Sequence, residues 1–277
     1  MKKTAHIVTC LQRLCVLLLF FFTHERLSPV LGAACPVPAG IKNPNITTVC
    51  VGATVSATFT PRDASCTIEA QYSLDGGATW NAYTPGTPVV TTSTGNNRAQ
   101  IRGRQTCTTP ACTVSGWTTL RWTVVAQPDF TLVKNATSNL PAVCAGKTVQ
   151  ATFTRTGGVG CKDTIQYRYD GVGNWINYST NPGSPYTISI PTMAGITLVE
   201  IRAWRSNCTA GSGCTNTPIK TLSWNVVPQP KRATLNTANP NLPTVCRGQP
   251  VSATFNAGTG GVGCVDVFQY SYNNNGT

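Results

Sequence analysis

Hydrophobic and polar residues alternate along short segments of this chain, and one such segment occurs three times. In residues 55–60, valine, alanine and phenylalanine take every second position, with serine and threonine between them. A period of two predicts a β-strand with one buried and one solvated face. The segment 50–59, which begins with a cysteine, returns at 144–153 and 246–255. The copies begin 94 and 102 residues apart. Three copies at this spacing predict a tandem array of domain-sized units.

The first two units share a further order of strands and turns. Residues 99–102 and 199–202 correspond, as do 120–125 and 222–227, and a proline-containing linker ends each unit. Proline cannot donate to a strand ladder, so it ends the last strand. No sustained helical period of apolar residues follows residue 40. About seven short strands per unit predict an all-β fold of tandem immunoglobulin-like β-sandwiches, with Trp80 equivalent to Trp175 and Trp122 to Trp224.

The expected boundaries follow from these repeats. They are a signal peptide at 1–34, a first Ig-like repeat at 35–130, a second at 131–230 and an incomplete third at 231–277. The third copy stops inside the hairpin that holds Trp80 in the first. We therefore expect the chain to be a fragment of a longer protein.

The first 34 residues have the pattern of an export signal. Lys2, Lys3 and Arg13 precede an apolar run at 14–22, and small residues follow at 32–34. The run is shorter than the roughly 20 residues that span a bilayer. This predicts a secreted or cell-surface protein without a transmembrane span in the processed chain. Acylation of Cys35 is the weaker alternative. A lipoprotein signal has leucine three places before the acylated cysteine, but Gly32 stands there and Leu31 lies one place too early.

Composition argues against several kinds of function. Both histidines, His6 and His24, lie in the signal region, so the processed chain lacks the commonest general base and metal ligand. It keeps 17 basic and 8 acidic residues, a net charge of +9, and the basic residues are scattered. Nucleic-acid binding would need a clustered basic stripe. We expect neither a nucleic-acid partner nor a cofactor.

Catalysis is not expected either. A glycosidase needs two carboxylates beside one cleft. The eight acids that remain are spread over three units and form no repeated close pair. The chain is therefore predicted not to be an enzyme.

The hairpin at residues 73–80 carries a recognisable motif, with a serine, an aspartate, two glycines, a threonine and a tryptophan in that order. Glycines allow the tight turn, the aspartate accepts backbone N–H groups and the tryptophan covers the hairpin base. The residues resemble the Asp-box of sialidases, which implies a structural role away from any catalytic centre. The second copy departs from the motif, with Arg168 where the serine was. The residues concerned are Ser73, Asp75, Gly77, Thr79 and Trp80, with Asp170 and Trp175 in the second copy.

Eleven cysteines remain after the signal region, and in an exported protein they are disulfide candidates. Without histidine or paired CxxC motifs a zinc site is not expected. Besides Cys35, the candidates follow the repeat: Cys50, Cys66, Cys107 and Cys112, then Cys144, Cys161, Cys208 and Cys214, then Cys246 and Cys264.

Two pairing schemes are open, and local pairing is favoured because short loops close at little entropic cost. It joins Cys107 to Cys112, Cys208 to Cys214, Cys50 to Cys66, Cys144 to Cys161 and Cys246 to Cys264. The rival scheme joins Cys66 to Cys107 or Cys112 and sends the other cysteine to a neighbouring unit, with Cys35 serving the first repeat.

Three motifs occur in the repeated region 41–277: the strand C-x-G-x-x-V-x-A-T-F, the hairpin Y-S-x-D-G-G-x-x-W and the ending W-x-V-V-x-Q-P. With these motifs the region resembles tandem Ig-like repeats in large secreted surface proteins of Bacteroidetes-type bacteria. The resemblance implies an adhesin-like or structural array, here a disulfide-stapled spacer or presentation stalk with another surface protein as a candidate partner. The alternative is a carbohydrate-binding module that uses exposed aromatic residues on a polysaccharide. Trp117 and Trp204 are its best candidates because neither has a counterpart in the other complete repeat.

Overall fold

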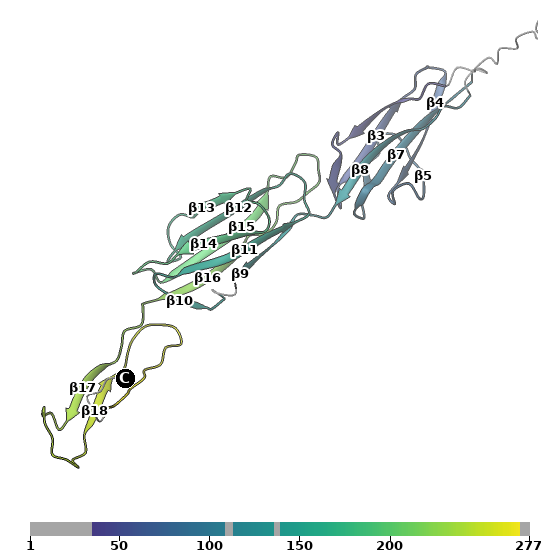
Figure 1. Cartoon of the computed structure of the whole chain (residues 1–277). Helices are drawn as coiled ribbons and strands as arrows, with labels where there is room; N and C mark the ends of the chain where they lie inside the picture. Colours follow the sequence, from purple (N-terminus) through teal and green to yellow (C-terminus); the bar gives the residue numbers. More distant parts are fainter. Residues whose placement is uncertain (1–34, 109–112, 136–138, 272–277) are drawn as a thin grey trace, which may run out of the picture. The chain divides into compact units, whose positions relative to one another are not determined.

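A computed structural model describes residues 35–108, 113–135 and 139–271 (Figure 1). These residues form strands and connecting loops and contain no helix, so the prediction of an all-β fold is confirmed. It follows that they contain no helix that could cross a membrane. The predicted signal peptide and Cys112 lie outside the described residues.

The first eight strands make a sandwich of two sheets, in which β1, β3 and β6 form one sheet and β2, β8, β7, β4 and β5 form the other. Strand β2 runs parallel to β8, and the remaining pairs with a known register are antiparallel. The bounds are β1 (Ala39–Asn43), β2 (Thr48–Cys50), β3 (Thr54–Thr60), β4 (Cys66–Ser73), β5 (Asn81–Ala82), β6 (Val89–Val90), β7 (Gly95–Cys107) and β8 (Thr118–Val125).

The next eight strands repeat this topology. Strands β9, β11 and β14 form one sheet, and β10, β16, β15, β12 and β13 form the other, with β10 parallel to β16. The shared strand order confirms the prediction of tandem Ig-like sandwiches. The bounds are β9 (Asp129–Lys134), β10 (Ala142–Cys144), β11 (Thr148–Thr156), β12 (Lys162–Tyr169), β13 (Ile176–Thr180), β14 (Tyr186–Pro191), β15 (Leu198–Ser206) and β16 (Lys220–Val227).

The predicted equivalences lie at matching places in the two sandwiches. Trp122 in β8 and Trp224 in β16 are both fully buried. Trp80 directly precedes β5, as Trp175 directly precedes β13. Burial alternates along β15, so one set of side chains enters the core and the other lies on the outer face of its sheet. This alternation decides which residues are available on the surface.

The third copy forms a two-stranded sheet of β17 (Thr234–Asn239) and β18 (Ser252–Asn256). Its apolar side chains are exposed, Phe255 by 44% and Val251 by 65%. In the second sandwich the equivalent residues, Phe153 and Val149, are fully buried. A single hairpin has no second layer to cover its apolar face, which accounts for the difference.

The described residues divide into two compact units. The smaller comprises 35–39, 60–69, 103–108 and 113–118, and the larger comprises the other described residues. The predicted domain boundaries do not coincide with this division and stay a prediction.

Candidate functional site

Arginine and tryptophan side chains gather on the outer face of the β12–β15 sheet in the second sandwich. In the strand register Gln166 lies opposite Arg202, and the Arg202 guanidinium donates to Gln166 Oε1 at 2.9 and 2.7 Å. That guanidinium lies 4.0 Å from the centroid of the Trp175 ring and 5.4 Å from that of Trp204. Arg168 lies 4.4 Å from the same Trp175 centroid. We call Arg168, Trp175, Arg202 and Trp204 the arginine–tryptophan face.

This face is stabilised mainly by charge and polarisation. A guanidinium over an indole ring is attracted by the ring quadrupole. Arg168 Nε also donates to Glu200 Oε2 at 2.6 Å. Burial lowers the pKa of Arg202, and the nearby charge of Arg168 lowers it further. Because two cations lie close together here, the tryptophan rings and the Glu200 carboxylate offset a repulsion that the arginines would otherwise face.

The first sandwich repeats one of these arrangements at the equivalent positions and has a second pair at positions of its own. In the larger unit Arg102 donates to Gln71 and lies 3.7 Å from the Trp80 centroid. In the smaller unit Arg104 lies 4.6 Å from the Trp117 centroid and 2.7 Å from Glu69 Oε2. Trp117 and Trp204, the sequence candidates for ligand binding, are thus both partly exposed and each contacts an arginine of β7 or β15. Because side chains alternate along a strand, the sequence alone predicts Arg202 and Trp204 on one face of the sheet. Their stacking, and that of Arg202 on Trp175, is visible only in the structure.

The engaged rings limit what this surface can bind. A sugar stacks on a free aromatic face, and a guanidinium at about 4 Å occupies such a face. Trp204 has the longest of these distances, so its ring is the one that a guanidinium covers least closely. The carboxylates of Glu69 and Glu200 each accept from an arginine. In each sandwich a guanidinium therefore engages the carboxylate beside the tryptophan.

The Asp75 hairpin is a hydrogen-bonded turn. The Asp75 carboxylate accepts from the Thr79 amide at 2.9 Å, from the Thr79 hydroxyl and from the Ser73 hydroxyl, and Ser73 Oγ accepts from the Gly77 amide at 2.8 Å. The Thr79 hydroxyl, then the Thr79 amide, lower the pKa of Asp75 well below its ordinary value. The turn leaves Gly76 and Gly77 at positive φ, where glycine is favoured.

Asp170 has different partners from its counterpart. Its Oδ1 accepts from the Thr197 amide at 2.6 Å, the Thr197 hydroxyl and the Leu198 amide at the start of β15. The carboxylate therefore ties the end of β12 to a strand that is distant in sequence. The Thr197 amide is the main cause that lowers the pKa of Asp170. This difference agrees with the departure of the second copy from the motif.

A buried ion pair in the second sandwich gave no clear signal in the sequence. Asp163 is fully buried, and its Oδ1 accepts from Arg205 Nε at 2.8 Å, while Oδ2 accepts from Arg155 Nη1 at 2.8 Å. Arg205 Nη1 also donates to the Asp129, Thr156 and Gly157 carbonyls. Both charges lie at inward positions of their strands. That placement follows from alternation only once the register is known.

The disulfides correct the favoured local scheme. Cys66 pairs with Cys107 and Cys161 with Cys208. Local pairs between Cys50 and Cys66, Cys144 and Cys161, and Cys208 and Cys214 are therefore wrong, and Cys107 does not pair with Cys112. Strands β4 and β7 are adjacent, as are antiparallel β12 and β15, so the start of one lies beside the end of the other. Cys246 and Cys264, also expected to pair, are both free.

The third disulfide joins the two sandwiches within the larger unit. Cys50, at the end of β2, pairs with Cys214 of the β15–β16 loop, with a Cα–Cα distance of 5.1 Å. The rival scheme foresaw both kinds of bond, one within a repeat and one to its neighbour. Cys35 is also disulfide-bonded, as that scheme requires.

Hydrogen bonds surround this link. Cys50 N–H donates to Ser212 O at 2.8 Å. The Gln127 side-chain amide donates to Val51 O at 2.5 Å and to Gly213 O at 3.1 Å, and its oxygen accepts from the Thr215 amide at 3.0 Å. Gly213 has φ +67°, and a Cβ there would lie 2.4 Å from Ala53 Cβ. A larger residue could not take that position without a shift.

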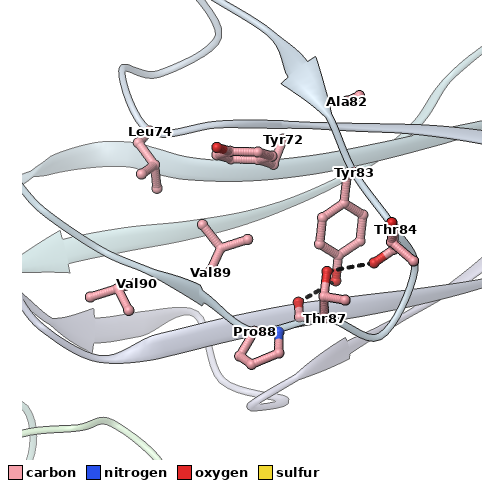
Figure 2. Close-up of a pocket in the computed structure, with 9 residues that line it drawn as sticks. All are labelled: Tyr72, Leu74, Ala82, Tyr83, Thr84, Thr87, Pro88, Val89 and Val90. Carbon is pink, nitrogen blue, oxygen red and sulfur yellow. Dashed lines mark hydrogen bonds between the residues drawn. The ribbon is translucent and has the colours of Figure 1, made fainter.

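A pocket of about 450 Å³ lies beside the β5 edge of the first sandwich (Figure 2). The Tyr83 hydroxyl accepts from the Ala57 amide at 2.8 Å and lies 2.9 Å from Thr87 O. Backbone groups thus use this hydroxyl, and Tyr72, Leu74 and Val89 supply apolar surface. The residues that line the pocket include no carboxylate, histidine or cysteine. Among the described residues no group of side chains is arranged to hold a metal ion.

Comparisons with known proteins assign the chain to no family. No protein-family model and no curated protein matches it. Solved structures that align include fibronectin(III)-like modules of Clostridium thermocellum CbhA, at 12% identity over 68% of this chain and 94% of the other, with a TM-score of 0.30. The human OSCAR ligand-binding domain aligns at 12% identity over 69% and 99%, with a TM-score of 0.28. The fold assignment rests on the strand order.

Proposed function

We propose that this chain is a non-enzymatic, exported repeat protein of the cell surface, in which disulfide-braced Ig-like sandwiches act as an adhesin-like spacer or presentation stalk. The observation that carries the proposal is the Cys50–Cys214 bond between consecutive sandwiches. A binding or catalytic domain needs no covalent bond to its neighbour. A spacer that must keep its length under load benefits from one.

The bond changes how tension would pass through the chain. When the ends are pulled apart, force passes through the Cys50–Cys214 sulfurs, and the residues between them carry no load. The bond spans 164 residues, which includes most of both sandwiches. Fully extended, a segment of this length would reach about 550 Å. The intact bond withholds this length from a chain under tension.

Single-molecule force spectroscopy on the full chain tests this. We expect the oxidised chain to release none of the shielded length, and the Cys50→Ser/Cys214→Ser variant to release about 250 Å more. The extra extension of the variant is less than the extended length of all 164 residues, because two disulfides within this segment stay closed. Cys66–Cys107 and Cys161–Cys208 still withhold 41 and 47 residues from extension.

The matched control is Cys144→Ser, which removes a free thiol at the equivalent place in the second sandwich. It should extend like the unaltered chain. If the oxidised unaltered chain lengthens as much as the double variant, the bond bears no load and the spacer function is wrong.

One observation favours a carbohydrate-binding module as a second candidate. Trp204 is partly exposed, and its ring centroid lies 5.4 Å from the Arg202 guanidinium, farther than the 4.0 Å of Trp175. Its ring could stack on a sugar. Binding of the full chain to a polysaccharide panel, lost in Trp204→Ala at an unchanged melting temperature, would support this function. Absence of binding to every polysaccharide, or binding that Trp204→Ala leaves unchanged, would exclude this use of Trp204.

A further inference from the structure

The second sandwich contains a copy of the place where the first sandwich receives a loop. In the first sandwich, the turn at residues 50–53 together with Gln127 holds the β15–β16 loop through the Cys50–Cys214 bond. We call this turn and its glutamine the first socket. Residues 144–147 with Gln229 form the equivalent second socket, and Cys144 is a free, partly buried cysteine.

The two sockets share their hydrogen bonds one for one. In the first, Thr91 Oγ1 donates to Cys50 O at 3.0 Å and Gly52 N–H to Thr91 O at 2.9 Å. In the second, Thr192 Oγ1 donates to Cys144 O at 3.2 Å and Gly146 N–H to Thr192 O at 3.0 Å.

The glycine and glutamine of the two sockets also match. Gly52 and Gly146 have φ of 88° and 80°. The Gln229 side-chain amide donates to Ala145 O, as Gln127 does to Val51 O. The second socket therefore has the same local conformation as the first.

We propose that the second socket binds the cysteine-bearing β15–β16-type loop of another Ig-like unit, and that Cys144 forms a disulfide with that loop. The evidence for the occupant is internal, because the equivalent residues of the first socket are bonded to such a loop. The inference rests on the proposed function in that both concern covalent joints between sandwiches. It extends the joint to a partner outside the described residues.

The first socket defines what the occupant must carry. Gly213 precedes the bonded cysteine, and a Cβ there would lie 2.4 Å from Ala53 Cβ. Lys147 stands at the position of Ala53 and has a Cβ at the same place in the turn. The occupant therefore needs glycine directly before its cysteine. It also needs an N–H that can donate to the Gln229 oxygen, as the Thr215 amide donates to Gln127.

The bond forms by thiol–disulfide exchange with a disulfide oxidant, such as a periplasmic or extracellular oxidoreductase, or glutathione disulfide in vitro. The Cys144 thiolate attacks the oxidant's disulfide and releases one thiol. The loop thiolate then attacks the mixed disulfide and releases the second. Two protein thiols are oxidised, the oxidant is reduced to two thiols, and two protons pass to the leaving thiolates.

The experiment incubates the full chain with a synthetic peptide of residues 207–217 that carries Cys208→Ser, in a buffer of reduced and oxidised glutathione. Peptide mapping then measures the adduct at each free cysteine. Cys246 and Cys264 are exposed, whereas Cys144 is only partly so. Exposure alone would favour the first two. We expect the peptide adduct at Cys144 to exceed that at either exposed cysteine by about fivefold, from the hydrogen bonds of the socket.

Two matched controls separate recognition from thiol reactivity. A peptide with the additional change Gly213→Ala keeps the same thiol, and the Gln229→Ala chain keeps Cys144. Each should reduce the peptide adduct at Cys144 by about fivefold. Glutathione adducts at Cys144 should not change.

Equal adducts for the glycine and alanine peptides, a distribution that follows exposure, or no adduct at Cys144 would each overturn the inference. Because this readout concerns Cys144 and the force measurement concerns Cys50–Cys214, either proposal can fail alone.

Discussion

At the scale of single residues, the buried Asp163–Arg205 pair is the most consequential arrangement in the second sandwich. The Asp163 carboxylate is fully buried and receives two guanidinium groups. A buried charge is tolerated only when it is paired and hydrogen-bonded. Removing one partner leaves the other without compensation, which costs more than the pair itself contributes.

We therefore expect Asp163→Asn to lower the free energy of unfolding by about 3 kcal/mol, measured by urea denaturation of the oxidised chain. The control is Glu69→Gln, which breaks a pair whose side chains are 41% and 33% exposed. It should cost less than about 1 kcal/mol because solvent screens exposed pairs. Similar decreases in the free energy of unfolding of the two variants would show that burial does not determine how much an ion pair contributes to stability.

The Asp75 turn predicts a dependence of stability on pH. Hydrogen bonds from Thr79, first from its hydroxyl and then from its amide, lower the pKa of Asp75 below its ordinary value of 3.8. A carboxyl whose pKa is lower in the folded state stabilises the fold above the unfolded pKa, and this stabilisation is lost as pH falls toward the folded value.

The melting temperature of Asp75→Asn should thus lie below that of the unaltered chain at pH 6, and the gap should narrow below pH 3.8. Thermal unfolding followed by circular dichroism at a series of pH values measures this gap. A gap that stays constant down to pH 2.5 would contradict the account.

At the scale of elements, the arginine–tryptophan face joins β12, β15 and the segment before β13. The single side chain of Arg202 contacts Gln166, Trp175 and Trp204. Its replacement removes two hydrogen bonds and two cation–π contacts at once. The adjacent strands are thereby held together by side chains as well as by their ladder.

Arg202→Ala should lower the free energy of unfolding by about 1–2 kcal/mol and shift tryptophan emission to longer wavelength as Trp175 gains solvent. Lys162→Ala, at an exposed position of the same sheet, is the control and should change stability by less than about 0.5 kcal/mol. An unshifted emission spectrum would mean that the guanidinium does not cover Trp175.

At the scale of the whole molecule, the cysteine pairs decide which segments are covalently joined. Proteolysis under non-reducing conditions should yield linked peptides for Cys50 with Cys214, Cys66 with Cys107 and Cys161 with Cys208. In Cys50→Ser, Cys214 should become open to alkylation while the other two pairs persist. A peptide that links Cys208 to Cys214 would refute this pattern and restore the local scheme.

The sequence by itself determined the features that depend on short segments. The period of two in residues 55–60, the turn glycines and the linker prolines are local, so they predicted strands, their order and the Ig-like class. Repetition assigned Cys50 and Cys144, or Trp122 and Trp224, to equivalent places without any coordinates. The Asp75 turn could be foreseen for the same reason, because its partners Ser73 and Thr79 lie within four residues.

Only the tertiary structure decided which distant residues meet. Loop-closure entropy favoured short cysteine loops, but that cost belongs to the unfolded chain, whereas the strand order fixes which sulfur atoms are adjacent in the folded one. Cys50 therefore pairs with a residue 164 positions away. Register likewise brought Asp163 to Arg205 and Gln166 to Arg202. Pairing in a β-sheet is non-local, so a local pattern can name the strands but not their neighbours.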